Sequence, residues 1–222
     1  MGKIQSGVSI KYKKINLFFI LKLIYKKFRR KKNLAKIKKF DISKKPTAKD
    51  LLIEDLEERW GYAADLVWRV WVAAPKNLAI AMGEGWDKGN AFIQRWTRMD
   101  GAHDGPAGCK ALGITEKDAR AAAAAGLYLL MNTMMNKDFE VVEWTPDLVV
   151  VRWYDCLQWE IAKEWGIAKS FANEHTFDCP GVCRNWWSVL ARAVSADLKI
   201  EFWPAMPEGG KYCQLKIERV KP

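Results

Sequence analysis

The sequence predicts an α+β domain in which an N-terminal helical layer packs with an antiparallel sheet of two hairpins and two intervening helices. Helical periodicity dominates from Thr47 to Asn136. Alternating β-branched and aromatic residues then appear in two pairs of short runs, which is typical of β-hairpins. Between those pairs lie two further helical segments, so strands and helices do not alternate as they do in a parallel α/β fold.

A basic leader precedes this domain. Residues 1–49 hold 17 of the 37 Lys and Arg and one of the 26 acidic residues, so residues 50–222 carry 20 basic and 25 acidic residues and a net charge of −5. We expect residues 1–45 to form a flexible or amphipathic leader and residues 46–222 a single domain, with a helical part at 46–136 and a hairpin, helix, helix, hairpin part at 137–222.

The apolar run at residues 16–25 is too short to span a bilayer, which needs roughly 20 residues. Lys22 interrupts it and no small-residue cleavage site follows, so we expect no secretion signal and a cytoplasmic location, peripheral to the membrane if the leader binds lipid. An anionic membrane surface is therefore a candidate partner of residues 1–45. The alternative is that residues 1–45 are a dispensable extension. Because residues 50–222 are acidic, we expect no nucleic-acid partner for this part of the chain, outside the leader. The sequence leaves open whether the protein forms an oligomer.

The helical part should begin with two helices, or one kinked at Gly61, over residues 48–74. A second helix is expected to open at Pro75, because proline is tolerated in a first helical turn, and to reach Met99. Glycine and proline content predicts a loop over residues 100–113. The next helix should take Thr115 as its N-cap and end near Asn136.

In the second part, residues 139–144 and 148–153 form one predicted hairpin, and residues 198–203 and 212–220 form another. The helices between them are expected to begin near Leu157 and Val182.

Four of the five cysteines fall in this second part, each beside an expected strand end or helix start: Cys156, Cys179, Cys183 and Cys213. An odd number of cysteines in a reducing compartment favours free thiols, used for packing, metal binding or catalysis. Cys156 begins a helix, where the helix dipole favours a thiolate, and Glu160 and His175 are the nearest candidate bases. These three are the predicted catalytic residues.

Cys179, Cys183 and Cys213 form an alternative set of metal ligands, although their spacing lacks the paired motifs of common zinc folds. The cofactor is unknown, with a divalent metal as one option. Seven of the twelve tryptophans also lie in this part, more than a small core accommodates easily, which favours an aromatic site for a planar or apolar molecule. The predicted substrate-binding residues are Gln158, Trp153, Trp159, Trp186 and Trp187.

Several segments resemble the L-2-amino-thiazoline-4-carboxylic acid hydrolase family and its uncharacterised relatives: LGITEKDARAAAAA, FEVVEWTPDLVVVRWYDCLQWE, FDCPGVCRNWW and GGKYCQLKIE. The order of elements is also similar to that of four-vinyl reductase-type small-molecule-binding domains. The family resemblance implies a hydrolase that acts on a cyclic C–N substrate, thiazoline- or amidine-like, in an aromatic, cysteine-containing pocket. The alternative is a non-catalytic domain that binds or senses a small molecule or cofactor, so whether the protein is an enzyme stays open.

Overall fold

The computed structural model describes residues 40–133, 138–164 and 177–220. Contacts divide the chain into two compact units, Met1–Lys36 and Ile37–Pro222. The leader expected at residues 1–45 lies mostly outside the described residues. Its last part belongs to the domain, because the Phe40 N–H donates to the Leu112 carbonyl at 3.1 Å and buried Trp144 donates to the Ile42 carbonyl at 2.9 Å.

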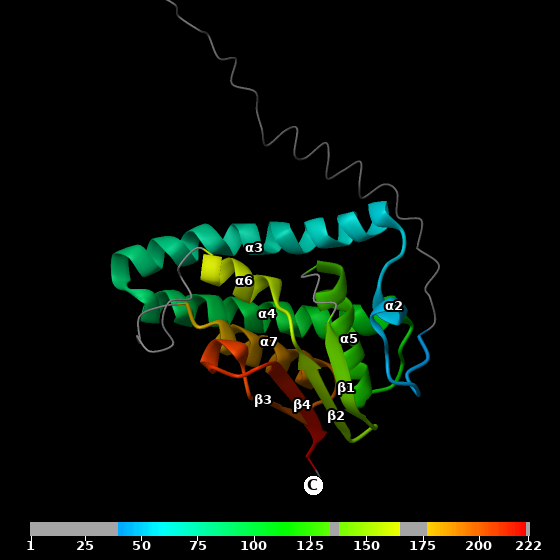
Figure 1. The fold of residues 1–222 in the computed structure, drawn as a ribbon. Helices are drawn as coiled ribbons and strands as arrows, with labels where there is room; N and C mark the ends of the chain where they lie inside the picture. The colour runs from blue at the N-terminus through cyan, green and yellow to red at the C-terminus, as the bar shows by residue number, and fades with distance from the viewer. Residues whose placement is uncertain (1–39, 134–137, 165–176, 221–222) are drawn as a thin grey trace, which may run out of the picture. The chain divides into compact units, whose positions relative to one another are not determined.

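The larger unit has the predicted α+β class (Figure 1). Its helices and strands run in this order: α2 (Ala48–Leu51), α3 (Leu56–Glu84), α4 (Trp86–Leu112), α5 (Ala119–Thr133), β1 (Phe139–Trp144), β2 (Leu148–Trp153), α6 (Leu157–Glu164), α7 (Cys179–Val194), β3 (Leu198–Phe202), the 3₁₀ turn η1 (Met206–Glu208) and β4 (Cys213–Arg219). None of the described helices is long and apolar enough to cross a membrane.

Both predicted hairpins are present and join into one antiparallel sheet of order β1-β2-β4-β3. The β2–β4 pairing that unites them places Val151 opposite Leu215 and Trp153 opposite Cys213. A register shift between Val141 and Glu143 makes a bulge in β1. Because side chains alternate along a strand, this register decides which residues share the inner face.

The two faces of the sheet differ in chemistry. Val149, Val151, Leu215 and Ile217 are fully buried on the face covered by α5 and α7 (Figure 1). The opposite face carries ion pairs between neighbouring strands, such as Lys199 with Glu218 at 2.9 Å. The hydrophobic core therefore lies between one sheet face and the helices, as alternation predicted.

The helical layer differs from the prediction in its boundaries. α3 continues through Pro75, which was expected to open a helix, and ends at Gly85 with φ of 92°. The predicted loop at 100–113 is wrong, because α4 runs without a break to Leu112 and includes Pro106. Glycine there serves packing rather than turning: a Cβ on Gly105 would lie 2.7 Å from the Leu190 carbonyl oxygen of α7.

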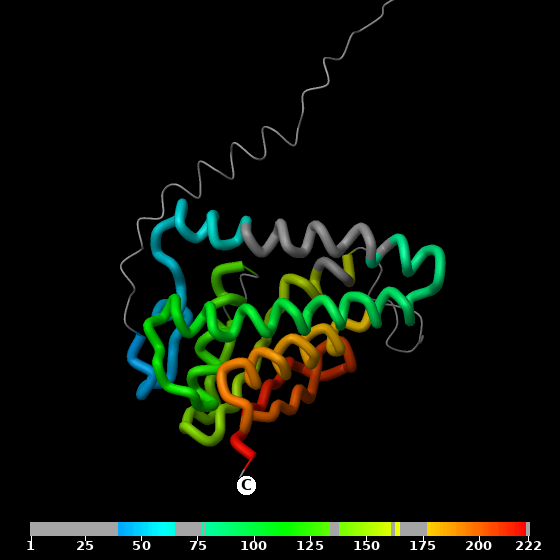
Figure 2. The backbone as a smooth tube through the Cα atoms, turned by 180° about the vertical axis from the view of Figure 1, so that it is seen from behind, coloured from blue at the N-terminus to red at the C-terminus, as the bar shows by residue number. Residues whose placement is uncertain are grey.

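Figure 2 shows the result from behind, with α4 and α7 running side by side. Gly101 and Gly105 face the backbone of α7, and Gly108 faces Ala125 of α5. Without side chains at these positions, the helix backbones approach more closely than larger residues allow.

Two helix starts also differ from expectation. Asp118, not Thr115, caps α5, since its carboxylate accepts a 3.0 Å hydrogen bond from the Ala121 N–H and binds Arg120 at 2.7 Å. α7 starts at Cys179, earlier than expected, and takes Pro180 into its first turn. Proline fits there because the first helical N–H groups have no partner within the helix.

Gly105→Ala should lower the free energy of unfolding by about 1–3 kcal/mol, because the added methyl group meets backbone that cannot move aside. Urea unfolding of the full-length protein measures this change. Gly61→Ala in α3 is the matched control: nothing lies within 4 Å of its added Cβ, so it should raise stability by ~0.5–1 kcal/mol through helix propensity. Equal effects of the two substitutions would refute the close approach of α4 and α7.

Candidate functional site

The start of α7 is held in place by α4. Asp178 caps α7 by accepting from the Gly181 N–H at 2.8 Å. The Gln94 side chain donates to the other Asp178 carboxylate oxygen at 2.7 Å, and the Asn90 amide oxygen accepts from the Asp178 N–H at 2.9 Å. These bonds fix the rotation of α7, and with it the direction of the cysteines and tryptophans that follow.

Four aromatic residues from α7 and the inner sheet face form what we call the aromatic cluster: Trp153, Trp186, Trp187 and Phe202. Trp153 of β2 lies 5.8 Å from Trp187 and 6.2 Å from Phe202, measured between ring centroids. Trp186 and Trp187 meet edge to face at 4.8 Å. Each of the four is at most 9% exposed, so the cluster is interior.

Two thiols, those of Cys183 and Cys213, adjoin the aromatic cluster, and we call them, together with Cys156, the thiol cluster. Cys213 lies directly opposite Trp153 in the β2–β4 register. Cys183 precedes Trp187 by four residues and so lies on the same side of α7. Electrostatic coupling links Cys156 to Cys183, and Cys213 to both. The chain thus brings together cysteines from a helix start, a helix interior and a strand.

Burial keeps these thiols neutral. It is the main reason that the pKa of Cys156 rises to about 11 and that of Cys213 to about 12. For Cys183, a hydrogen bond with the Cys179 thiol and then burial raise the pKa well above its usual value. The N–H groups of Trp159 and Gln158 at the start of α6 do lower the pKa of Cys156, as the helix position predicted, but burial outweighs them.

An unpaired hydrogen-bond donor lies within the aromatic cluster. The Trp153 Nε1–H is buried and has no hydrogen-bond partner, although the residue is only 3% exposed. The indole N–H groups of two other buried tryptophans are paired: Trp186 donates to the Asp104 carboxylate at 2.9 Å and Trp144 to the Ile42 carbonyl at 2.9 Å. Buried donors are paired in the great majority of cases. The indole N–H of Trp96 in α4 is also buried without a partner, but only Trp153 of these two belongs to the aromatic cluster.

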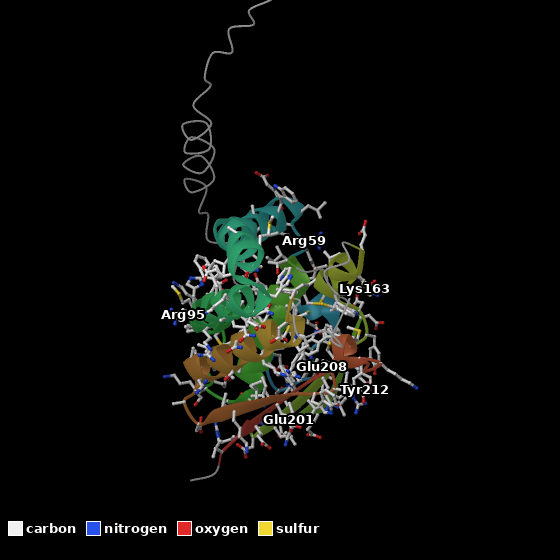
Figure 3. The ribbon with its side chains drawn as sticks, turned by 90° about the vertical axis from the view of Figure 1, so that its left-hand side faces the viewer. Arg59, Arg95, Lys163, Glu201, Glu208 and Tyr212 are labelled. Carbon is white, nitrogen blue, oxygen red and sulfur yellow. The ribbon has the colours of Figure 1, made fainter. Side chains whose placement is uncertain are left out.

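The connection between β3 and β4 borders the thiols. Arg184 of α7 binds both carboxylate oxygens of Glu208, at 2.7 and 2.8 Å, and the Met206 N–H donates to the Cys213 sulfur at 3.3 Å. Figure 3 labels Glu208 and, further along this connection, Tyr212. Sequence reasoning missed the Arg184–Glu208 pair, because no local pattern links residues so far apart in the chain.

The predicted site residues separate into three groups. Trp153, Trp186 and Trp187 come together, and Cys156 interacts with Cys183 and Cys213, while Gln158 and Trp159 lie half-buried at the start of α6. Glu160, the predicted base, is exposed and binds Lys163 at 2.7 Å. His175 lies outside the described residues. The predicted catalytic roles of Cys156, Glu160 and His175 remain predictions.

The described part of the chain contains no group of three or more His, Cys, Asp or Glu arranged to hold a metal ion. Cys179, Cys183 and Cys213, the alternative metal ligands, therefore form no such set.

No family model matches the chain, and no curated protein matches it. The resemblance to the thiazoline hydrolase family thus stays a prediction. Solved structures similar to this chain include the phenol-responsive sensory domain of the transcription activator PoxR with phenol, at a TM-score of 0.47 and 7% identity, over 68% of this chain and 74% of that one. Another is a trafficking protein particle complex subunit 3 from Naegleria fowleri covalently bound to palmitic acid, at a TM-score of 0.44 and 9% identity, over 70% and 94%. Such TM-scores establish neither a shared fold nor a shared ligand.

The raised thiol pKa values make stability fall in alkaline solution. Below pH 9 both folded and unfolded thiols are protonated, so this contribution is fully present; between pH 9 and about 12 the unfolded chain loses its protons first and unfolding becomes easier. For Cys213 the loss should be on the order of 4 kcal/mol across that range. Urea unfolding of wild type and Cys213→Ala at pH 8, 9.5 and 11 measures it, with the variant correcting for other groups that titrate there. If the free energies of unfolding of the two proteins change with pH in the same way, the raised pKa of Cys213 is contradicted.

Proposed function

We propose that this domain binds a small, uncharged, flat apolar molecule that carries a hydrogen-bond acceptor, at the junction of the aromatic and thiol clusters. The buried and unpaired Trp153 Nε1–H is the observation that carries this proposal. Leaving such a donor without a partner costs about 1–3 kcal/mol. A ligand oxygen at hydrogen-bond distance from Nε1 removes this penalty.

The surrounding chemistry favours a neutral ligand. The three thiols carry no charge at neutral pH, because burial raises the pKa of Cys156 and Cys213, and a hydrogen bond with Cys179 followed by burial raises the pKa of Cys183. The nearby Arg184 and Glu208 neutralise one another through two hydrogen bonds. A charged ligand would lose its hydration here without gaining an opposite charge. Flat apolar surface suits the aromatic rings, which take offset or edge-to-face partners.

The contacts favour binding over hydrolysis. Hydrolytic opening of a thiazoline ring requires a group that activates water and one that protonates the leaving thiol. Glu160 faces solvent beside Lys163, and the thiols of the cluster are protonated and therefore poor bases. We accordingly place the ligand-binding function ahead of the hydrolase predicted from the family resemblance.

Acetophenone and ethylbenzene test the role of Trp153, because they have similar size and only the ketone accepts a hydrogen bond. Wild-type protein should bind acetophenone about tenfold more tightly, the equivalent of ~1.4 kcal/mol. Trp153→Phe keeps a ring and loses the N–H, so it should bind the two compounds equally. Isothermal titration calorimetry measures both affinities on the full-length chain.

Trp144→Phe is the matched control. It also removes a buried indole N–H, but that group already bonds the Ile42 carbonyl. This variant should keep the preference for acetophenone and lose about 1 kcal/mol of stability. The proposed function fails if wild type binds the two compounds equally or binds neither.

A further inference from the structure

We infer that Trp187 limits the size of the ligand at this site and that Gly126 of α5 sets the position of its ring. This inference rests on the proposed function and adds a specificity-determining pair to it. The sequence pattern indicated Trp187 only as one of several substrate-binding residues and gave no sign of a role for Gly126.

Trp187 is held from two sides. It is 1% exposed, and its ring lies against Gly126: a Cβ added there would overlap Trp187 Cη2 and Cζ3. Two other rings also contact the Trp187 ring. The ring centroid of Trp153 lies 5.8 Å away with an interplanar angle of 45°, and that of Trp186 lies 4.8 Å away. The ring thus reaches from α5 to the residue that carries the unpaired N–H. Any ligand that bonds to Trp153 has Trp187 as a neighbour.

The composition of α5 supports a specific purpose for the glycine. Residues 121–125 are five consecutive buried alanines, and Gly126 follows them in the helix interior. Glycine is about 1 kcal/mol less favourable than alanine in such a position. Gly126 has no positive φ that would require glycine. What requires it is the space that the indole of Trp187 occupies.

The size of the residue at position 187 should therefore set the size of ligand accepted next to Trp153. Phenylalanine there keeps an aromatic neighbour and removes the indole atoms Cη2 and Cζ3 that lie against Gly126, which frees space between Trp153 and α5 for a larger ligand. Substitution of Gly126 by alanine acts in the opposite direction, because the added methyl group on α5 pushes the indole of Trp187 toward Trp153. Substitutions at positions 187 and 126 should therefore shift the relative affinity for a small and a large ligand in opposite directions.

Acetophenone and 2-acetonaphthone are suitable probes, since they share the ketone acceptor and differ by one fused ring. Wild-type protein should prefer acetophenone, and Trp187→Phe should shift the ratio of the two dissociation constants toward 2-acetonaphthone by about tenfold, within the range that a change of pocket volume produces. Trp144→Phe, a buried tryptophan that bonds Ile42 instead, should leave the ratio unchanged. Calorimetry on the full-length chain gives all six constants.

An unchanged ratio in Trp187→Phe overturns the size-limiting role while acetophenone binding still supports the proposed function. Absence of acetophenone binding in wild type overturns both.

A thermal unfolding cycle tests the Gly126 contact without any ligand and covers the case in which Trp187→Phe binds poorly because it is destabilised. Gly126→Ala should lower Tm by roughly 5 °C in wild type, as expected for overpacking. In the Trp187→Phe background the same substitution should lower Tm by less than half as much, because the overlapping ring atoms are gone. Equal losses in both backgrounds overturn the role of Gly126.

Discussion

The close approach of α4 and α7 is the contact on which the rest of this structure depends. Gly101 and Gly105 allow it by presenting no side chain to the backbone of α7. Once the helices are close, the buried Asp104 carboxylate can accept from the Trp186 indole, and Asn90 and Gln94 can hold Asp178. These bonds fix α7 against sliding and rotation. The positions of Cys183 and Trp187, and so the geometry of the candidate site, follow from that helix pair.

Competition between burial and helix position decides the chemistry of the site. A cysteine at a helix start is usually associated with a lowered pKa, and two backbone N–H groups of α6 act in that direction on Cys156. The interior setting acts the other way and is stronger. The outcome is a region of neutral thiols and aromatic rings with one unused donor, which suits recognition of an uncharged molecule better than attack on one.

Features that depend on neighbouring residues were predictable from the sequence. Alternation around Val149 and Val151, and around Leu215 and Ile217, identified both hairpins because each strand buries one face. Features set by contacts distant in sequence were not. Gly101 and Gly105 suggested a loop, and only the presence of α7 explains why a helix needs them. Tryptophan and cysteine content correctly indicated an aromatic, thiol-containing region, but the Trp153–Cys213 register and the Arg184–Glu208 pair arise from pairings that no local pattern encodes.

The bulge in β1 has a consequence for solubility. β1 and β3 are the outer strands of the sheet, where unpaired backbone groups invite strands from other molecules. In β1 the register shift between Val141 and Glu143 breaks the regular spacing of the backbone hydrogen-bonding groups. The Lys45 ammonium group donates a 2.8 Å hydrogen bond to the Val142 carbonyl oxygen, which is then no longer free to pair with another strand. β3 is only five residues long and carries the charged Lys199 and Glu201 on its outer side. Both margins of the sheet are therefore poor templates for the addition of strands from other molecules.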